Sequence, residues 1–169
     1  LIGNKRTDTT MAVIKGVGVN QDGRTATMTA PNGPSQVRCI EMALRDASMT
    51  ADEIDFIEAH GTGTGLGDPI ELGSINRLMQ SCVLMGAVKG NIGHSEGAAG
   101  IAGLIRTIMV VRNHTAPCNI HLRCLNESID PTGVGFPTQP VKIEQKTVRA
   151  GVSSFGFGGT NSHAIIESV

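Results

Sequence analysis

Three glycine-rich blocks of the sequence carry side chains with proton-transfer and hydrogen-bonding chemistry. Residues 58–64 read EAHGTGT and residues 67–71 read GDPIE, directly after an apolar segment typical of a strand. Residues 89–94 read KGNIGH, and residues 151–163 read GVSSFGFGGTNSH. Glycine permits sharp turns and close approach of a ligand to the backbone, and histidine is most useful near neutral pH. Three such blocks in one small chain predict loops that converge on a single site.

The composition limits the possible classes of function. The chain has 169 residues, which suits one domain or part of a larger one. Its net charge is −1 and its isoelectric point about 6.6, so it does not attract polyanions. Aromatic residues make up 2% of the chain, with no Trp or Tyr to stack on bases. We therefore predict no nucleic-acid partner.

The hydrophobic pattern predicts no membrane span. The longest apolar run, residues 98–111, is interrupted by glycine and arginine and is too short to cross a bilayer. Four cysteines without a dense framework fit a reducing compartment. No targeting segment is visible, so we expect the cytoplasm or an organelle stroma. Because the chain opens at Leu1 without an initiator methionine, we expect a segment of a longer polypeptide.

Strand-like and helix-like segments alternate along the chain, which predicts a layered α/β fold with a mixed sheet flanked by helices. The predicted strands are residues 11–19, 54–59, 83–88, 148–154 and 163–168. The predicted helices run from Pro34 to about Ala47, from Asp68 to about Met79, and from Gly97 to Arg112. Asp68 is the predicted N-cap of the second helix, with Glu71 completing a capping box. Residues 113–140 are predicted to be irregular.

The blocks, in this order, resemble the β-ketoacyl synthase (ketosynthase) domains of the thiolase superfamily, and type I polyketide synthases above all. NQDG at residues 20–23 and TAPNGPSQ at residues 29–36 fit the same family, as does GAAG after KGNIGH. The resemblance implies the C-terminal half of a thiolase-like αβα fold, normally stacked on a similar N-terminal half. It assigns residues 1–30 to the end of the N-terminal half and residues 31–169 to the C-terminal half.

The resemblance also implies a reaction. An intact ketosynthase joins an acyl-cysteine thioester to a malonyl-type unit on acyl carrier protein by decarboxylative Claisen condensation, in polyketide or fatty acid biosynthesis. The family's nucleophilic cysteine lies upstream of these blocks, and no cysteine here has a similar context. The segment alone is therefore expected to be inactive. The implied partners are acyl carrier protein, the N-terminal half and a second copy of the intact enzyme. The phosphopantetheine arm of the carrier holds the substrate, and no cofactor is expected to bind directly.

The resemblance assigns roles to individual residues. His60 and His94 would hold the extender thioester carbonyl and stabilise the enolate. Lys89 would organise the site electrostatically, paired with Asp68 or Glu71. The backbone N–H of Phe157 would help form an oxyanion hole, and its ring would gate entry of the acyl chain. The residues expected to contact the substrate or the phosphopantetheine arm are Thr62, Thr64, Phe155 and Gly156.

Two segments depart from the usual family pattern. Gly90 stands where many relatives carry serine, and residues 95–97 read SEG in place of a more usual TQA. Neither departure touches a residue with an implied chemical role. Both histidines and the lysine are present, which favours a condensing enzyme over a non-elongating relative.

Several other interpretations compete with this one. Four potential zinc ligands stand at short spacing, namely His114, Cys118, His121 and Cys124, but no knuckle glycine accompanies them, so we predict no metal. Residues 151–155 lack the final glycine of a hydrolase nucleophile elbow. The glycine blocks match neither a dinucleotide motif nor a P-loop. His114 and His163 are interpreted as structural, with His163 bonding the glycine turn. An inactive truncated fragment or a carrier-protein docking module stays open as the non-enzymatic alternative.

Overall fold

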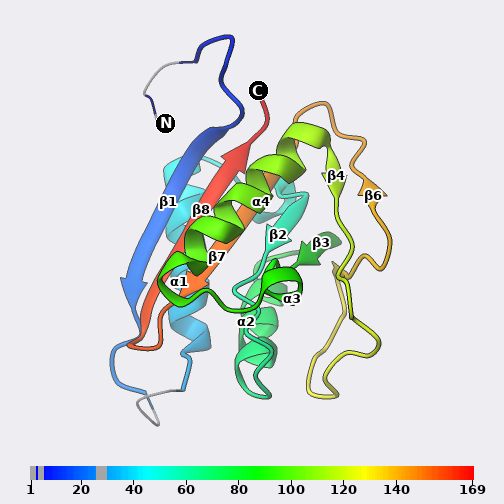
Figure 1. Ribbon diagram of the computed structural model, residues 1–169. Helices are drawn as coiled ribbons and strands as arrows, with labels where there is room; N and C mark the ends of the chain where they lie inside the picture. Colours follow the sequence, from blue (N-terminus) through cyan, green and yellow to red (C-terminus); the bar gives the residue numbers. More distant parts are fainter. Residues whose placement is uncertain (1–2, 4–5, 26–29) are drawn as a thin grey trace.

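A mixed sheet flanked by helices forms the core of the computed structural model, which describes residues 3, 6–25 and 30–169 (Figure 1). In chain order the elements are β1 (Val13–Gln21), α1 (Gly33–Ala47), β2 (Phe56–Glu58), α2 (Gly67–Asn76), β3 (Val83–Gly86), α3 (Lys89–Ile92), α4 (Ala99–Asn113), β4 (Thr115–Ala116), β5 (Val134–Gly135), β6 (Val141–Lys142), β7 (Arg149–Phe155) and β8 (Thr160–Glu167). Single turns of 3₁₀ helix cover Ala51–Glu53 and Glu96–Ala98. Within the described ranges, six strands share one sheet in the order β1-β8-β7-β2-β3-β5, and β4 pairs separately with β6.

The strand directions bring the three glycine-rich blocks to one edge of the sheet. β7, β2, β3 and β5 run parallel to one another, whereas β8 runs antiparallel to both of its neighbours, β1 and β7. Parallel strands end at the same edge, and ligands bind there in α/β sheets. The first two blocks lie mainly in the segments that follow β2 and β3, and the third spans the end of β7, the turn after it and the start of β8. Their convergence therefore follows from the topology.

Helices cover both faces of the sheet and make two separate cores. On one face α1 and α2 pack through Ile40, Leu44, Leu72 and Ile75. On the other face α4 lies across β7 and β2, as Figure 1 shows, and packs through Val110 and Val111. The predicted αβα layering is confirmed.

Helix α1 lies directly on the backbone of β1 because two glycines leave room for it. A Cβ atom at Gly16 would lie 2.3 Å from the Ala43 carbonyl oxygen, and one at Gly18 would lie 2.2 Å from that of Cys39. The helix begins where Asn32 accepts a hydrogen bond from the Ser35 N–H. Pro34 lies in the first turn, one residue inside the observed start of the helix.

The predicted strands are all present, with shifted ends. β1 extends beyond its predicted end at Val19, because Asn20 and Gln21 continue the pairing with β8. The strand predicted to reach Val88 ends at Gly86, where the chain turns toward α3. These differences arise from pairing partners that no local pattern specifies.

The remaining boundary errors lie in segments without periodicity. β8 begins at Thr160 and not at His163, since its first residues pair with both β1 and β7. Residues 113–140 contain β4 and β5, which are too short for alternation to reveal them. Helix α2 ends at Asn76, before the predicted Met79.

The prediction that Asp68 caps the second helix is wrong. Leu66 occupies the N-cap position of α2 without a side-chain bond, and Asp68 lies inside the first turn. Glu71 completes no capping box, because its carboxylate accepts hydrogen bonds from a neighbouring loop. The local pattern fits a cap, but both carboxylates accept backbone N–H groups from outside the helix.

Residues 13–21 pair with β8 at the edge of the main sheet, so they share that sheet with the rest of the chain. The assignment of residues 1–30 to the end of a preceding half stays a prediction about a longer protein. Thr29, the first residue of the TAPNGPSQ motif, lies outside the described residues. None of the helices in the described part of the chain has the length and apolarity that a bilayer crossing requires.

Candidate active site

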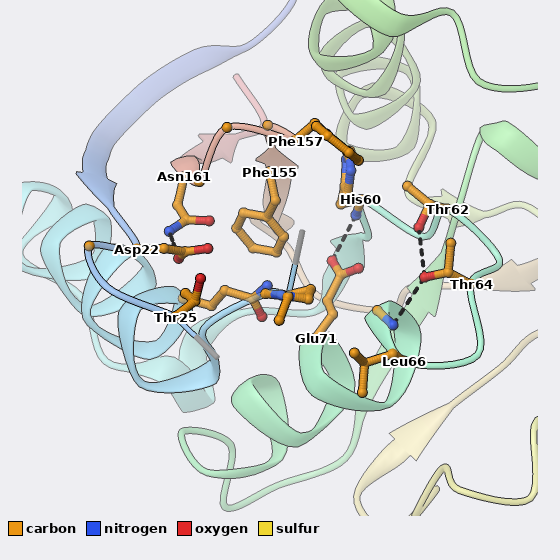
Figure 2. A pocket seen from close by; sticks show the side chains of 18 of the residues that line it. Asp22, Thr25, His60, Thr62, Thr64, Leu66, Glu71, Phe155, Phe157 and Asn161 are labelled. Atoms are coloured by element: carbon orange, nitrogen blue, oxygen red, sulfur yellow. Dashed lines mark hydrogen bonds between the residues drawn. The ribbon is translucent and has the colours of Figure 1, made fainter. Parts of the chain in front are cut away.

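His60 and His94 lie with their rings close together beyond the ends of β2 and β3. The ring centroids are 5.6 Å apart and the planes are nearly perpendicular, at 87°. The ring of Phe155, from the end of β7, is 5.7 Å from the His60 ring. All three line a cavity of about 620 Å³, part of which Figure 2 shows. Of the other predicted site residues, the same cavity is lined by Thr62, Thr64, Glu71, Gly156 and Phe157.

The loop that carries His60 is held by the buried carboxylate of Glu71. Its Oε1 accepts the His60 N–H at 2.7 Å and its Oε2 accepts the Gly61 N–H at 2.9 Å. Figure 2 shows Glu71 reaching from α2 to this loop. Burial raises the pKa of Glu71 to about 7, against the opposing effect of these N–H groups and of Lys89. The Glu71 side chain therefore fixes the conformation of the loop by accepting two of the loop's backbone N–H groups.

Gly61 is required at its position for two reasons. Its φ is +50°, in the left-handed region, and a Cβ atom there would lie 2.6 Å from the Cβ of Ala87. The loop after β2 therefore packs directly against the start of the turn after β3. Asp68 supports the same loop, because its Oδ1 accepts the Gly63 N–H at 3.1 Å.

The environment of His60 keeps its imidazole neutral at pH 7. Burial first, and then electrostatic interaction with Lys89 and with the neighbouring ring of His94, lower its pKa to about 4. The Nδ1 atom is buried and has no hydrogen-bond partner among the described residues. A neutral imidazole donates one N–H and accepts at its other nitrogen. His60 can therefore polarise an oxygen without carrying a full charge.

His94 has its tautomer set by the turn that follows it. The Glu96 N–H donates to His94 Nδ1 at 3.0 Å, so a neutral ring carries its proton on Nε2. Glu96 adopts a φ of +47° to present this N–H, an uncommon conformation for a residue with a side chain. The Nε2–H of His94 is thus a second donor at the cavity.

Lys89 is not among the described residues that line the cavity. It is the first residue of α3 and is half-buried. Burial lowers its pKa, while the carboxylates of Glu71, Glu58 and Asp68 raise it. Within the described ranges it makes no ion pair at salt-bridge distance. The expected pairing of Lys89 with Asp68 or Glu71 is therefore not an ion pair at salt-bridge distance, although both carboxylates act on the pKa of the lysine.

Glu58 and Arg106 form a buried ion pair beneath the site, and sequence reasoning assigned neither a role. The Oε2 atom of Glu58 pairs with Arg106 Nη1, and its Oε1 accepts the Val88 N–H at 2.6 Å. The guanidinium of Arg106 lies 5.7 Å from the ring centroid of Phe56. Burial raises the pKa of Glu58, and Arg106 opposes this shift. The sequence signal for this ion pair was Arg106 itself, a charged residue inside the apolar run of residues 98–111.

The glycine turn between β7 and β8 presents Phe157 at its tip. The Gly156 N–H bonds the Thr160 carbonyl at 2.7 Å, and the Gly159 N–H bonds the Gly156 carbonyl at 2.9 Å. The Phe157 side chain is 78% exposed. In the part of the chain that the structure describes, the Phe157 N–H bonds no protein group, so it is free to donate to a ligand.

Asp22 and Asn161 hold the base of this turn, and neither was singled out from the sequence. The Asp22 N–H donates to the Gly159 carbonyl at 2.8 Å, and the Asn161 amide donates to Asp22 Oδ1 at 2.6 Å. Both residues line the cavity, as Figure 2 shows. The sequence signal for them was their membership of the NQDG and GGTN motifs.

The two threonines of the first block form a small hydroxyl cluster. Thr62 Oγ1 and Thr64 Oγ1 are 3.4 Å apart, and Thr64 Oγ1 accepts the Gly67 N–H at 3.0 Å. Thr64 is exposed and Thr62 half-buried. The pair therefore orders the mouth of the cavity next to α2 and leaves hydroxyl groups facing it.

The alternative zinc ligands are not brought together. No three His, Cys, Asp or Glu side chains of the described residues are grouped as a metal site. The His114 ring donates from Nδ1 to the Gln145 carbonyl at 3.1 Å, which agrees with a structural role. His163 is buried within β8 and its Nδ1 pairs with Ser153 Oγ at 2.9 Å. The prediction that His163 bonds the glycine turn is therefore wrong, because its buried side chain bonds Ser153 of β7.

The described residues that line the cavity include no cysteine. Cys39 is a buried residue of α1, its thiol donates to the Gly18 carbonyl of β1, and burial raises its pKa to about 11. Such a thiol is a poor nucleophile, since the thiolate is the reactive form.

Comparisons with known proteins point to one family. Residues 11–123 match the family described as beta-ketoacyl synthase, C-terminal domain. Polyketide synthase GfsA of Streptomyces halstedii is 45% identical over 167 residues, covering 93% of this chain and 2% of that protein. A phenolphthiocerol/phthiocerol polyketide synthase of Mycobacterium tuberculosis is 47% identical over 168 residues, covering 95% of this chain and 11% of that protein.

Solved structures give the same result. The oxazolomycin ketosynthase domain OzmH KS7 of Streptomyces albus JA3453 superposes with a TM-score of 0.89 at 31% identity, covering 94% of this chain and 30% of that one. The ketosynthase from module 6 of the bacillaene synthase of Bacillus subtilis 168 has a TM-score of 0.88 at 33% identity, covering 94% and 31%. The chain thus spans under a third of each of these two structures and a small fraction of each curated relative.

Proposed function

The chain belongs to the β-ketoacyl synthase family as a C-terminal ketosynthase domain with the thiolase-like fold, and from this premise we propose that it supplies the groups for decarboxylation and condensation. The reaction joins an acyl-cysteine thioester to a malonyl-type thioester on acyl carrier protein. Carbon dioxide leaves, and a β-ketoacyl carrier forms. The observation that carries the proposal is the pair of imidazoles 5.6 Å apart at the wall of one cavity.

The first charge to stabilise is on the enolate. When the malonyl carboxylate leaves as carbon dioxide, its bonding electrons move onto the thioester oxygen. His94 Nε2–H and the neutral ring of His60 are proposed to donate to that oxygen. Preorganised donors at a developing negative charge usually contribute most to catalysis, about 10²–10³-fold for one donor. The lowered pKa of His60, about 4, supports this role because the ring stays neutral at pH 7.

The second charge develops when the enolate carbon attacks the acyl thioester. The carbonyl oxygen then becomes a tetrahedral oxyanion, and the cysteine thiolate leaves as the carbonyl re-forms. We assign the backbone N–H of Phe157 as a donor to this oxyanion. Phe155 and Gly156 lie beside it on the cavity wall. The nucleophilic cysteine comes from the N-terminal half of the domain in this proposal, since Cys39 is sequestered.

The substrate arrives on the phosphopantetheine arm of acyl carrier protein. Thr62 and Thr64 are proposed to bond that arm, because their hydroxyl groups face the cavity mouth. Lys89 sits among three carboxylates and is proposed to balance their charge, and not to touch the substrate. No cofactor is required by these steps.

The N-terminal half is the proposed partner of the apolar surface on α4. Ile101, Ile105 and Met109 recur every four residues on this helix and are 53%, 58% and 50% exposed. Apolar patches of this kind on soluble proteins mark contact surfaces. We propose that the intact enzyme is a homodimer, with the carrier protein as a transient partner.

The test uses the intact ketosynthase and measures two steps separately. Acyl transfer to the cysteine is followed by mass spectrometry, and carbon dioxide release from malonyl carrier protein is followed by isotope label. His60→Ala and His94→Ala are each expected to lower decarboxylation about 10²-fold or more while acyl transfer is retained. Equal losses in both steps, or no loss in either, would contradict the proposal.

A further inference from the structure

Two consecutive backbone N–H groups directly before Lys89 are bonded by side chains from distant segments. The Ala87 N–H donates to Asn119 Oδ1 at 3.3 Å, and the Val88 N–H donates to Glu58 Oε1 at 2.6 Å. Asn119 comes from the segment after β4 that the sequence predicted to be irregular. The start of the turn that carries Lys89 and His94 is therefore bonded on two sides.

The Asn119 amide takes the place of a strand partner. β5 pairs with β3 at Val83 and Leu84, and the pairing does not reach the next residues of β3 in the described chain. Asn119 Nδ2 donates to the Met85 carbonyl at 2.9 Å, while its Oδ1 accepts the Ala87 N–H. A side-chain amide offers an acceptor and two donors in one plane, much as a peptide group offers its pair. The Asn119 amide thus bonds the end of β3 as a neighbouring strand would, at the point where the turn that carries Lys89 and His94 begins.

Asn119 is itself fixed in position. Its backbone N–H donates to the Pro137 carbonyl at 2.7 Å, and Nδ2 makes a second bond to the same oxygen at 3.3 Å. The side chain is half-buried, so these bonds are partly shielded from water. Breaking them leaves polar groups without partners, which costs more than the bonds contribute.

Ala87 also connects the two histidine loops. The Cβ of Ala87 lies so near Gly61 that any side chain there would overlap it, at 2.6 Å. A shift of Ala87 therefore moves the loop of His60 as well as the turn of His94. The distance between the two imidazoles depends on where this alanine is held.

We propose that Asn119 is a positioning residue for the decarboxylation site: its amide holds the end of β3 and thereby sets the spacing of the His60 loop and the Lys89–His94 turn. This inference rests on the proposed function. It adds a residue that touches neither substrate nor the reacting atoms. Its effect is expected on the step that needs both histidines, and not on acyl transfer to a cysteine from the other half.

The test compares three variants of the intact ketosynthase. Asn119→Leu keeps the size and removes every side-chain bond. Asn119→Asp retains an acceptor oxygen, but its second oxygen would face the Met85 and Pro137 carbonyl oxygens, and this repulsion is expected to displace the side chain from the Ala87 N–H. Asn76→Leu is the matched control. Asn76 is also half-buried, and it bonds the Asp130 carbonyl at 2.9 Å, outside the turn that carries Lys89 and His94.

Both Asn119 variants are expected to lower decarboxylation while acyl transfer stays near the wild-type rate. A displacement near 1 Å can cost about 10²-fold in rate, and we expect a loss of that order for Asn119→Leu. Asn76→Leu is expected to lower the melting temperature without changing the ratio of the two rates. An unchanged ratio in both Asn119 variants would overturn the proposal.

A second measurement does not depend on catalysis. Hydrogen exchange at the amides of Ala87 and Val88 is expected to accelerate in the Asn119 variants and not in Asn76→Leu. If the wild-type enzyme releases no carbon dioxide, the proposed function fails while the exchange result still tests Asn119. Wild-type exchange rates at both amides in Asn119→Asp would overturn the positioning role, including the case in which Asn119→Leu fails to fold.

Discussion

The backbone N–H of His60 donates at 2.7 Å to the buried carboxylate of Glu71, eleven residues further along the chain. The same carboxylate accepts the next N–H, that of Gly61. The loop of His60 is therefore held by helix α2, whose residues Leu72 and Ile75 pack in the core. A change at Glu71 affects the site without removing any group proposed to meet the substrate.

Glu71→Gln should destabilise the chain. The amide that replaces one carboxylate oxygen points a donor at a donor, either at His60 or at Gly61, and leaves a buried N–H unsatisfied. The expected loss in the free energy of unfolding is about 1–3 kcal/mol, measured by urea denaturation. Glu41→Gln is the control, because its pair with Arg45 is exposed and its loss should be within about 0.5 kcal/mol. Equal stability of the two variants would refute a structural role for Glu71.

The stability of the chain should depend on pH through groups with opposite effects. Burial lowers the pKa of His163 from 6.5 to about 4, so its contribution is complete above pH 6.5 and is lost as the pH falls toward 4. Burial raises the pKa of Glu71 from 4.5 to about 7, so its contribution is complete below pH 4.5 and is lost as the pH rises toward 7. The two slopes oppose each other between pH 4.5 and 6.5.

Removing the titratable carboxyl group of Glu71 should expose the pH dependence that His163 contributes to stability. In Glu71→Gln, the free energy of unfolding should fall more steeply on acidification from pH 6.5 than in the wild type. The difference in slope has an upper limit of about 1.4 kcal/mol per pH unit for one group. Urea denaturation at a series of pH values measures it, and a slope unchanged by the substitution would show that Glu71 does not titrate in this window.

Arg106→Met should leave Glu58 buried without its cation. Removing one partner of a buried pair typically costs about 3–5 kcal/mol, and we expect a loss of this size in the free energy of unfolding. The double variant Glu58→Gln with Arg106→Met should recover part of it, because the uncompensated charge is gone. Arg45→Met, on the protein surface, is the matched control. A double variant less stable than Arg106→Met would argue against the charge as the cause.

Ile105→Lys should have opposite effects in the chain alone and in the intact ketosynthase. In this chain the side chain is exposed, so the lysine should reduce self-association, as measured by light scattering. In the intact enzyme the lysine would be buried against the N-terminal half, and the melting temperature should fall. Glu41→Lys, on α1, should change neither property. An unaltered melting temperature for Ile105→Lys would place the interface elsewhere.

The sequence predicted the convergence of the blocks because three blocks of similar chemistry occur in one small chain. The physical reason came from the structure, in which β2, β3 and β7 are parallel and end at one edge of the sheet. The family resemblance also named His60, His94 and Phe157, and the structure places all three at one cavity. The predicted capping role of Asp68 was wrong because a local pattern cannot report competition from the Gly63 N–H. The expected pairing of Lys89 with Asp68 or Glu71 does not reach salt-bridge distance in the described chain, because side-chain reach cannot be read from a motif.

The supporting residues could not be found from the sequence. Glu58 reaches Arg106 across 48 residues, and Asn119 reaches Met85 across 34. Such pairs follow no helical or strand period, and each member alone resembles an ordinary polar residue. Strand β5 was missed for a related reason, since two residues show no alternation. The order of the strands in the sheet brings these residues together, and that order cannot be read from the local sequence.

The anchoring of the two histidine loops bears on the construction of hybrid synthases. Each loop is held by residues outside it: Glu71, on α2, for one, and Glu58, Arg106 and Asn119 for the other. A loop transplanted from a homologue therefore arrives without the groups that define its conformation. Recombination points that keep residues 56–137 together would exchange each loop along with its supports.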